Sequence, residues 1–208
     1  MGYRVSVIEE RAGAREALKR VAVALREGGV PFALAGGYAA WVYGAPEPDH
    51  DVDVIVPGEA AGPAAEVLAA AGLDVEHPPD GWLFKVRTDG AMVDVLLRLN
   101  GKDVGAEMLG RARELEVLSV MMPVSDVTDV VVGKLCALNE QRCDLNTVLP
   151  VARAVREQVD WERVARDIAG NDVAVACLYL LRRLGVVPSG TAVDEALALR
   201  SGISPPEA

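Results

Sequence analysis

The sequence predicts an α+β (α/β) fold, with a small mixed β-sheet and its helices in residues 1–122 and a helical bundle packed on this core in residues 123–208. Up to residue 121, short β-prone apolar runs alternate with helical patterns. An Asp-Gly step between two of these runs, Asp89-Gly90, is a strong hairpin signal. Beyond Pro123 the apolar residues recur only at helical spacing, so the rest of the chain is expected to be helical.

The elements follow in order along the chain. Residues 10–27 are expected to be a helix, because Leu18, Val21 and Leu25 recur at helical spacing and Gly28-Gly29 ends the pattern. The next elements are a buried strand (32–35), a short helix (38–43), a strand (51–56), an alanine-rich crossover helix (63–71), two hairpin strands (82–86 and 91–97) and a further strand (117–121). The helices expected after Pro123 are 126–139, with Ser125 as N-cap, then 145–158, 161–169, 173–184 and 193–200. The 208 residues, 51% of them hydrophobic, can bury a substantial core as one compact unit.

Two aspartates, Asp51 and Asp53, open an apolar run in which they alternate with Val52, Val54 and Val56. Because side chains two apart on a strand point to the same face, both carboxylates are expected at one edge or cleft of the sheet. Mg²⁺ typically takes one or two carboxylates together with substrate phosphates. The pair therefore suits a nucleotide-bound metal, and surface acids of an edge strand are the alternative.

A third carboxylate, Asp94, is the lone charge in the β-prone run from Met92 to Leu96. A buried, unpaired carboxylate is costly, so Asp94 needs a partner. A metal shared with Asp51 and Asp53 is one candidate, and an outward-facing strand position is the alternative.

The glycine pair Gly36-Gly37 lies between the buried strand and the short helix. Such a step makes a tight turn with bare backbone N–H groups at a helix N-terminus, which can hold a phosphate. A glycine pair alone is a weak signal, and so is Asp-x-Asp. In the order strand, glycine pair, helix, Asp-x-Asp strand, hairpin and Asp strand, they form a more specific pattern.

This pattern resembles that of the DNA polymerase beta-like nucleotidyltransferase superfamily. The matching segments are Ala35-Gly36-Gly37, Asp51-Val52-Asp53-Val54 and Val93-Asp94-Val95. Within the superfamily the chain is similar to bacterial members with a helical C-terminal half, including AbiEii-type and MenT-type toxins. Their later motif, a lysine in an apolar helix followed by an arginine and an aspartate, is matched by Lys134, Arg142 and Asp144.

The resemblance implies a Mg²⁺-dependent nucleotidyltransferase, which moves a nucleoside monophosphate from a nucleoside triphosphate to a hydroxyl group and releases pyrophosphate. It implies one or two Mg²⁺ ions on Asp51, Asp53 and Asp94, with Asp94 also activating the hydroxyl. The implied nucleotide contacts are Gly36, Gly37, Lys134 and Asp144. The residues themselves leave open that Lys134 is an ordinary lysine of a helix surface and that Asp144 is a helix N-cap.

The same resemblance implies an RNA 3′ end (such as that of tRNA), a protein hydroxyl or a small molecule such as an aminoglycoside as acceptor. A toxin would also have an antitoxin protein as partner. Relatives commonly carry an arginine and a threonine or serine before the acidic pair, where this chain has Glu47 and Asp49, and an aspartate where it has Thr147. Two acids in place of a cation and a hydroxyl make the entrance to the nucleotide site more negative, which disfavours binding of a triphosphate. The alternative function is therefore a catalytically degenerate module that binds a nucleotide or a protein.

Composition bears on nucleic-acid binding, on the state of the cysteines and on location in the cell. The net charge of −10 argues against broad non-specific binding of nucleic acid. The three cysteines, Cys136, Cys143 and Cys177, contain no Cys-x-x-Cys pair, so we expect reduced thiols rather than zinc or disulfides. No stretch approaches the roughly 20 apolar residues of a membrane span, and residues 1–20 lack a signal region. A cytoplasmic location without a membrane partner is therefore expected.

Overall fold

The computed structural model describes residues 2–49, 51–79, 81–88, 90–188 and 193, with side chains from residue 9 onward. The chain divides into two compact units, Met1–Val42 with Glu47–Asp126 and Tyr43–Pro46 with Val127–Ala208. This differs from the single compact unit expected from length and composition. The expected boundary after residue 122 stays a prediction, and strand β9 (Val120–Val124) runs across it.

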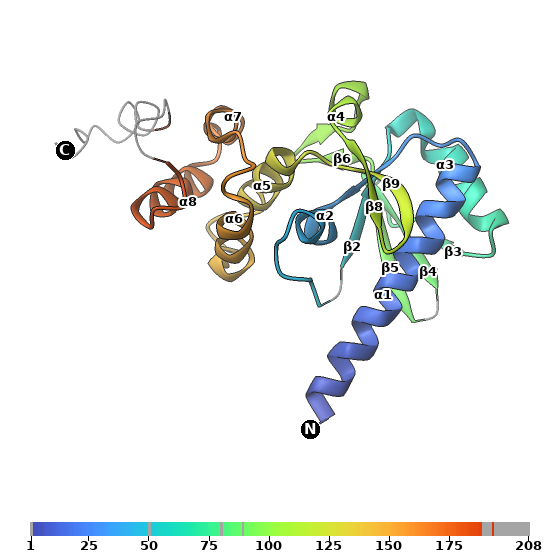
Figure 1. Ribbon diagram of the computed structural model, residues 1–208. Helices are drawn as coiled ribbons and strands as arrows, with labels where there is room; N and C mark the ends of the chain where they lie inside the picture. Colours follow the sequence, from blue (N-terminus) through green and yellow to red (C-terminus); the bar gives the residue numbers. More distant parts are fainter. Residues whose placement is uncertain (1, 50, 80, 89, 189–192, 194–208) are drawn as a thin grey trace. The chain divides into compact units, whose positions relative to one another are not determined.

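The first unit holds the sheet (Figure 1). Its elements are α1 (Gly2–Glu27), β1 (Ala33–Ala35), α2 (Gly36–Val42), β2 (Val52–Ile55), the 3-10 helix η1 (Gly58–Ala60), α3 (Ala61–Ala70), β3 (Asp74–Glu76), β4 (Leu83–Thr88), β5 (Ala91–Leu96), β6 (Arg98–Leu99), β7 (Lys102–Asp103), α4 (Ala106–Gly110), β8 (Arg113–Val117) and β9. Seven of the described strands form one mixed sheet in the order β3-β4-β5-β2-β1-β9-β8, and β6 pairs with β7. The pairs β2–β5 and β1–β9 are parallel, and the other neighbours are antiparallel. The mixed sheet with helices confirms the predicted fold class.

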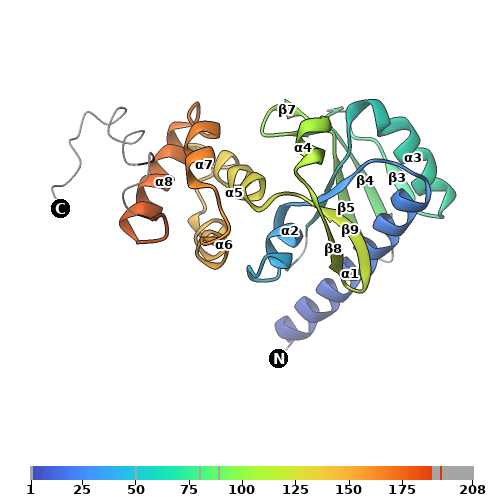
Figure 2. The same ribbon diagram turned by 45° about the horizontal axis from the view of Figure 1, so that its top comes forward.

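One face of the sheet packs against α1, which lies beside α3 (Figures 1 and 2). A Cβ added to Gly13 of α1 would lie 3.6 Å from the Cβ of Ala91, which places α1 over the face of β5 that carries Ala91 and Val93. Leu18 of α1 and Val93 are both fully buried, and burying a side chain of this kind contributes about 1.5–3 kcal/mol. Because strand residues alternate between faces, Asp94 points to the opposite face.

That opposite face is apolar in one half only. The apolar half is a cluster of Ala33, Ala35, Ile55, Leu83, Leu96 and Val104, against which Leu99, Met108, Leu109 and Ala112 pack. Residues of α4 and of the β6–β7 hairpin therefore cover this half. Two residues away along each strand, the next row on the same face consists of Asp53, Asp94 and Lys85, which are only partly buried.

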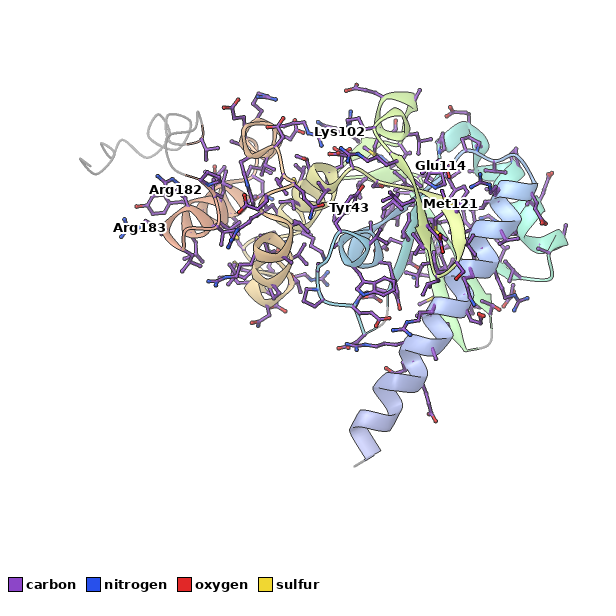
Figure 3. All side chains as sticks on the ribbon, in the orientation of Figure 1. Tyr43, Lys102, Glu114, Met121, Arg182 and Arg183 are labelled. Carbon is purple, nitrogen blue, oxygen red and sulfur yellow. The ribbon has the colours of Figure 1, made fainter. Side chains whose placement is uncertain are left out.

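The second unit is helical, with α5 (Val127–Cys136), the 3-10 helix η2 (Leu145–Thr147), α6 (Leu149–Val155), α7 (Trp161–Asp167) and α8 (Asp172–Arg183). Helix α5 contacts α6, α7 and α8, so it forms the centre of the bundle. The Asp160 and Asn171 side chains cap α7 and α8 by accepting the backbone N–H of the residue three positions later. Arg182 and Arg183 end α8 on its basic last turn (Figure 3).

The strand predicted over residues 117–121 is wrong, because a hairpin turn interrupts it. Leu118 and Ser119 have φ of 53° and 66°, the backbone of a two-residue turn between β8 and β9. Arg26 of α1 fastens this hairpin, since its Nη1 lies 3.1 Å from Oε2 of Glu114 and donates to the Met121 carbonyl at 2.6 Å (Figure 3). Asp89 of the predicted β4–β5 turn and residues 194–200 of the last predicted helix lie outside the described residues.

Candidate active site

A row of charged side chains crosses the sheet where β1 ends and β2 begins. Lys85 of β4 is paired in register with Asp94 of β5, Asp94 with Asp53 of β2, and Asp53 with Ala35 of β1. Residues paired in register point to the same face of a sheet, so the three charged side chains share the face opposite α1. The structure therefore brings together Asp53 and Asp94, two of the three carboxylates singled out from the sequence.

Gly36, the residue after Ala35, adjoins the Asp53 carboxylate. Its φ of +60° favours glycine, and an added Cβ would lie 1.9 Å from Oδ2 of Asp53 and 2.8 Å from its Cγ. A Cβ on Gly37 would lie 3.1 Å from the Cβ of Pro48, so Pro48 would have to move by a few tenths of an ångström. Gly36 is thus required both by its backbone conformation and by the space that Asp53 occupies. The phosphate contacts of Gly36 and Gly37 stay a prediction.

Asp51 does not belong to the same strand as Asp53. Strand β2 begins at Val52, and Asp51 has a left-handed φ of 61° and is exposed. The expectation that strand alternation aligns Asp51 with Asp53 is therefore wrong, because the chain turns at Asp51 instead of running extended. Val52, Val54 and Val56 are all buried, so the predicted core side of this strand is confirmed.

The partner of Asp94 in the structure is a lysine. Lys85 Nζ lies 2.9 Å from Oδ1 of Asp94, and the two side chains are 26% and 31% exposed. Like charges opposite each other in a sheet are destabilising, so Asp53 and Asp94 repel one another, and the Lys85 ammonium offsets part of this repulsion. The motif pattern does not include Lys85, and the structure places this lysine beside the Asp94 carboxylate.

Glu47 and Asp49, the acids that depart from the family pattern, are held by two arginines of α1. Arg15 binds Glu47 in a bidentate manner, Nε to Oε1 and Nη2 to Oε2, both at 2.6 Å. Arg11 Nη2 lies 2.7 Å from Oδ1 of Asp49 and donates to the Glu47 carbonyl at 3.2 Å. The hydrogen bond to Glu47 raises the pKa of Arg15, whose guanidinium also lies 5.8 Å from the Trp41 ring centroid. The two arginines therefore balance the charges of the two acids. This differs from the expectation that Glu47 and Asp49 make the entrance to the nucleotide site negative.

Tyr38 is a buried residue of α2, two positions after Gly36. Its ring stands edge-on to Trp41, with centroids 5.9 Å apart. Its hydroxyl has no hydrogen-bond partner within the described part of the chain. Burial, and secondarily the charge of Glu47, raise the pKa of Tyr38, so the side chain stays neutral.

Lys134 and Asp144 belong to the second unit, and their roles toward a nucleotide stay predictions. Lys134 is a partly buried residue of α5. Asp144 is the N-cap of η2, because its Oδ1 accepts the Asn146 backbone N–H at 2.9 Å. The capping role considered for Asp144 is therefore confirmed. Thr147 donates its hydroxyl to the Asp144 carbonyl at 2.8 Å.

The donor set fits a metal that arrives with phosphates. Among the residues with described side chains, no group of three or more His, Cys, Asp or Glu is arranged to hold a metal ion. Asp53 and Asp94 nevertheless face the same way from two adjacent parallel strands. Neighbouring strands of a sheet lie roughly 4.8 Å apart. Mg²⁺ needs only one or two carboxylates when substrate phosphates supply further oxygens. The set Asp51, Asp53 and Asp94 stays a prediction.

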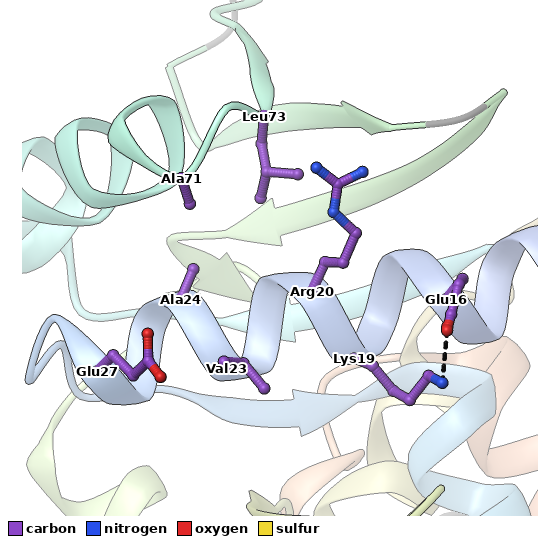
Figure 4. Close-up of a pocket in the computed structure, with 8 residues that line it drawn as sticks. All are labelled: Glu16, Lys19, Arg20, Val23, Ala24, Glu27, Ala71 and Leu73. Atoms are coloured by element: carbon purple, nitrogen blue, oxygen red, sulfur yellow. Dashed lines mark ion pairs between the residues drawn. The ribbon is translucent and has the colours of Figure 1, made fainter.

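A separate pocket of about 350 Å³ lies between α1 and the segment after α3 (Figure 4). Glu16, Arg20 and Glu27 of α1 line it together with Ala71 and Leu73. Because α1 covers the other face of the sheet, this pocket does not include the charged row.

Among the helices that the structure describes, none combines the length and the apolar character that a membrane span requires.

No protein-family model matches the chain, and no curated protein matches it significantly. Its structure is similar to the solution structure of the antibiotic-resistance factor ANT(2″)-Ia, with a TM-score of 0.54, 14% identity and coverage of 82% of this chain and 97% of that one. The lincosamide antibiotic adenylyltransferase LnuA gives 0.43, 12%, 61% and 89%, and a tRNA nucleotidyltransferase complexed with a primer tRNA and an incoming ATP analog gives 0.34, 15%, 82% and 63%. The fold assignment rests on the first of these, since only its TM-score exceeds 0.5. The chain therefore has an α/β fold of the nucleotidyltransferase kind.

Proposed function

We propose that the protein is a Mg²⁺-dependent nucleotidyltransferase that moves a nucleoside monophosphate from a nucleoside triphosphate to a hydroxyl group. The observation that carries this proposal is the pairing of Asp53 with Asp94, beside a glycine that leaves room for the Asp53 carboxylate. The fold shared with ANT(2″)-Ia supports it. One or two Mg²⁺ ions at the carboxylates supply neutralisation of the triphosphate and alignment of its α-phosphate.

The residues have distinct tasks in this reaction. The acceptor oxygen attacks the α-phosphorus, the bond from the α-phosphorus to the β-bridging oxygen breaks, and pyrophosphate leaves. Asp94 takes the proton of the acceptor hydroxyl. Asp53 of β2, with Asp51 just before this strand, holds the metal-bound nucleotide. Backbone amides of Gly36 and Gly37 bind the outer phosphates, and the further nucleotide contacts proposed are Lys134 and Asp144.

The acceptor classes proposed are an RNA 3′ end such as that of tRNA, a protein hydroxyl and an antibiotic of the aminoglycoside type. The toxin of a toxin–antitoxin pair, with an antitoxin protein as partner and a cytoplasmic location, is the biological role proposed for transfer to RNA or protein. Expression of the toxin alone is expected to arrest growth, and an antibiotic-modifying enzyme is expected to raise drug tolerance. A non-catalytic binding module loses the charge argument that favoured it, because Arg15 and Arg11 balance Glu47 and Asp49.

The test supplies Mg²⁺ and each nucleoside triphosphate, labelled at the α- or the γ-phosphate, to the purified protein together with total RNA, cell extract or an aminoglycoside. Transfer of the α-label, release of the γ-label as pyrophosphate, and loss of both in Asp51→Ala/Asp53→Ala are the expected results. The labelled product identifies donor and acceptor. Mg²⁺-dependent nucleotide binding without transfer to any of these acceptors would favour the binding module.

A further inference from the structure

Lys85 lies beside Asp94, at the site proposed above for the metal-bound nucleotide. The Lys85–Asp94 ion pair at 2.9 Å lies next to Asp53 in the same row, so one ammonium group and two carboxylates share one partly buried site. The row carries one excess negative charge in place of two. This arrangement affects cations and anions in opposite ways.

We propose that Lys85 is an internal counter-ion that makes the site poor for a free divalent cation and selective for a cation that arrives on a triphosphate. The inference rests on the proposed nucleotidyltransferase function and deepens it. A divalent ion at Asp53 and Asp94 is repelled by the ammonium group a few ångströms away. The negative triphosphate of a metal–nucleotide complex is attracted by the same group, since an ammonium is a compact point charge with three donors.

The position of Lys85 favours this role over that of an ordinary surface lysine. Its side chain is 26% exposed and shares the face of the sheet that carries Asp94, whereas its neighbour two residues on, Arg87, is 53% exposed and pairs with Glu76 at 3.1 Å. Lys85 and Arg87 lie on the same strand and the same face, but Arg87 is opposite Met92, one row further from the carboxylates. Arg87 is therefore a matched control for the loss of one positive charge.

The experiment measures two affinities of the purified protein. Free Mn²⁺ binding is followed by electron paramagnetic resonance without nucleotide, and metal-free binding of each of the four nucleoside triphosphates is followed by calorimetry in chelator. Lys85→Met is expected to bind Mn²⁺ about tenfold more tightly and the preferred triphosphate several-fold more weakly, because one unit charge is removed beside both ligands. Lys85→Arg is expected to keep both affinities close to the parent values, and Arg87→Met to change each by about twofold or less. Thermal unfolding checks that each variant is folded.

The two opposite shifts separate this role from a structural one. If Lys85 only stabilises the hairpin, Lys85→Met weakens both ligands together, and that result would overturn the inference. Unchanged Mn²⁺ affinity in Lys85→Met, with binding lost in Asp53→Asn, would overturn it as well and leave the proposed function standing. Absence of both Mn²⁺ binding and triphosphate binding in the parent protein and in every variant would overturn the proposed function together with the inference.

Discussion

Replacement of Gly36 by alanine tests whether this glycine makes room for the Asp53 carboxylate. Two costs add in the variant. The φ of +60° costs alanine about 1 kcal/mol. The new methyl group would also lie 1.9 Å from Oδ2 of Asp53, and the displacement that relieves such an overlap costs about 1–3 kcal/mol. We therefore expect Gly36→Ala to lower the free energy of unfolding by about 2–4 kcal/mol and to reduce nucleotidyl transfer, since Asp53 must move.

Gly29→Ala is the matched control. Gly29 has a φ of +66°, and an added Cβ would meet no atom within 4 Å, so only the backbone cost of about 1 kcal/mol is expected. Urea unfolding of the two variants therefore isolates the contact with Asp53. The same pair is then measured in an Asp53→Ala background, where the cost of Gly36→Ala should fall toward that of Gly29→Ala, because Oδ2 and Cγ are gone. Equal costs for the two glycines in the parent, or an unchanged difference in the Asp53→Ala background, would refute the reasoning.

Three further changes follow from the same structure. Arg15→Met is expected to lower the free energy of unfolding in urea by about 2 kcal/mol, because the Glu47 side chain, 11% exposed, loses its bidentate partner. The double variant Arg15→Met/Glu47→Met should recover most of this loss, and additive losses would contradict the coupling between the two side chains. Tyr38→Phe should leave stability unchanged or raise it by up to about 1 kcal/mol, since the buried hydroxyl has no partner among the described residues, and a larger loss would reveal one. Burial raises the pKa of Cys177 from 9.0 to about 11, so with rising pH the thiol ionises first in the unfolded chain. The free energy of unfolding therefore falls between pH 9 and 11, and Cys177 contributes at most roughly 1.4 kcal/mol per pH unit to this fall. Cys177→Ala should show a shallower fall in pH-dependent unfolding, and identical slopes would contradict the assignment.

Much of the charged row could be predicted because it is encoded locally. Asp53 and Asp94 each interrupt a β-prone apolar run, and such a charge must face away from the core or find a partner. Lys85 could have been found too. Counting outward from the turn that the sequence predicts at Asp89-Gly90 puts Thr88 opposite Ala91 and, three positions further, Lys85 opposite Asp94, and these two pairs are in register in the structure.

Other features depend on contacts or backbone angles that no local pattern reports. The turn at Asp51 breaks the alternation that otherwise aligns it with Asp53. The Leu118-Ser119 turn has neither Asn nor Gly to indicate it, so the sequence predicts a single strand over residues 117–121 where the β8–β9 hairpin turns. The pairing of Arg15 with Glu47 joins residues 32 apart in the chain, and their charges alone gave the opposite conclusion about the entrance. Lys134 and Asp144 are in the other compact unit, so their roles depend on ligand experiments.

The most direct test of the proposed catalytic site compares transfer of α-phosphate label by the parent protein and by single carboxamide variants. Asp53→Asn and Asp94→Asn are each expected to reduce transfer by at least about 100-fold, because the metal ligand or the proton acceptor is lost. Asp74→Asn, an exposed carboxylate of the edge strand β3, is the matched control and should transfer label at the parent rate. Transfer at the parent rate by Asp53→Asn or Asp94→Asn would contradict the assignment of this row as the catalytic site.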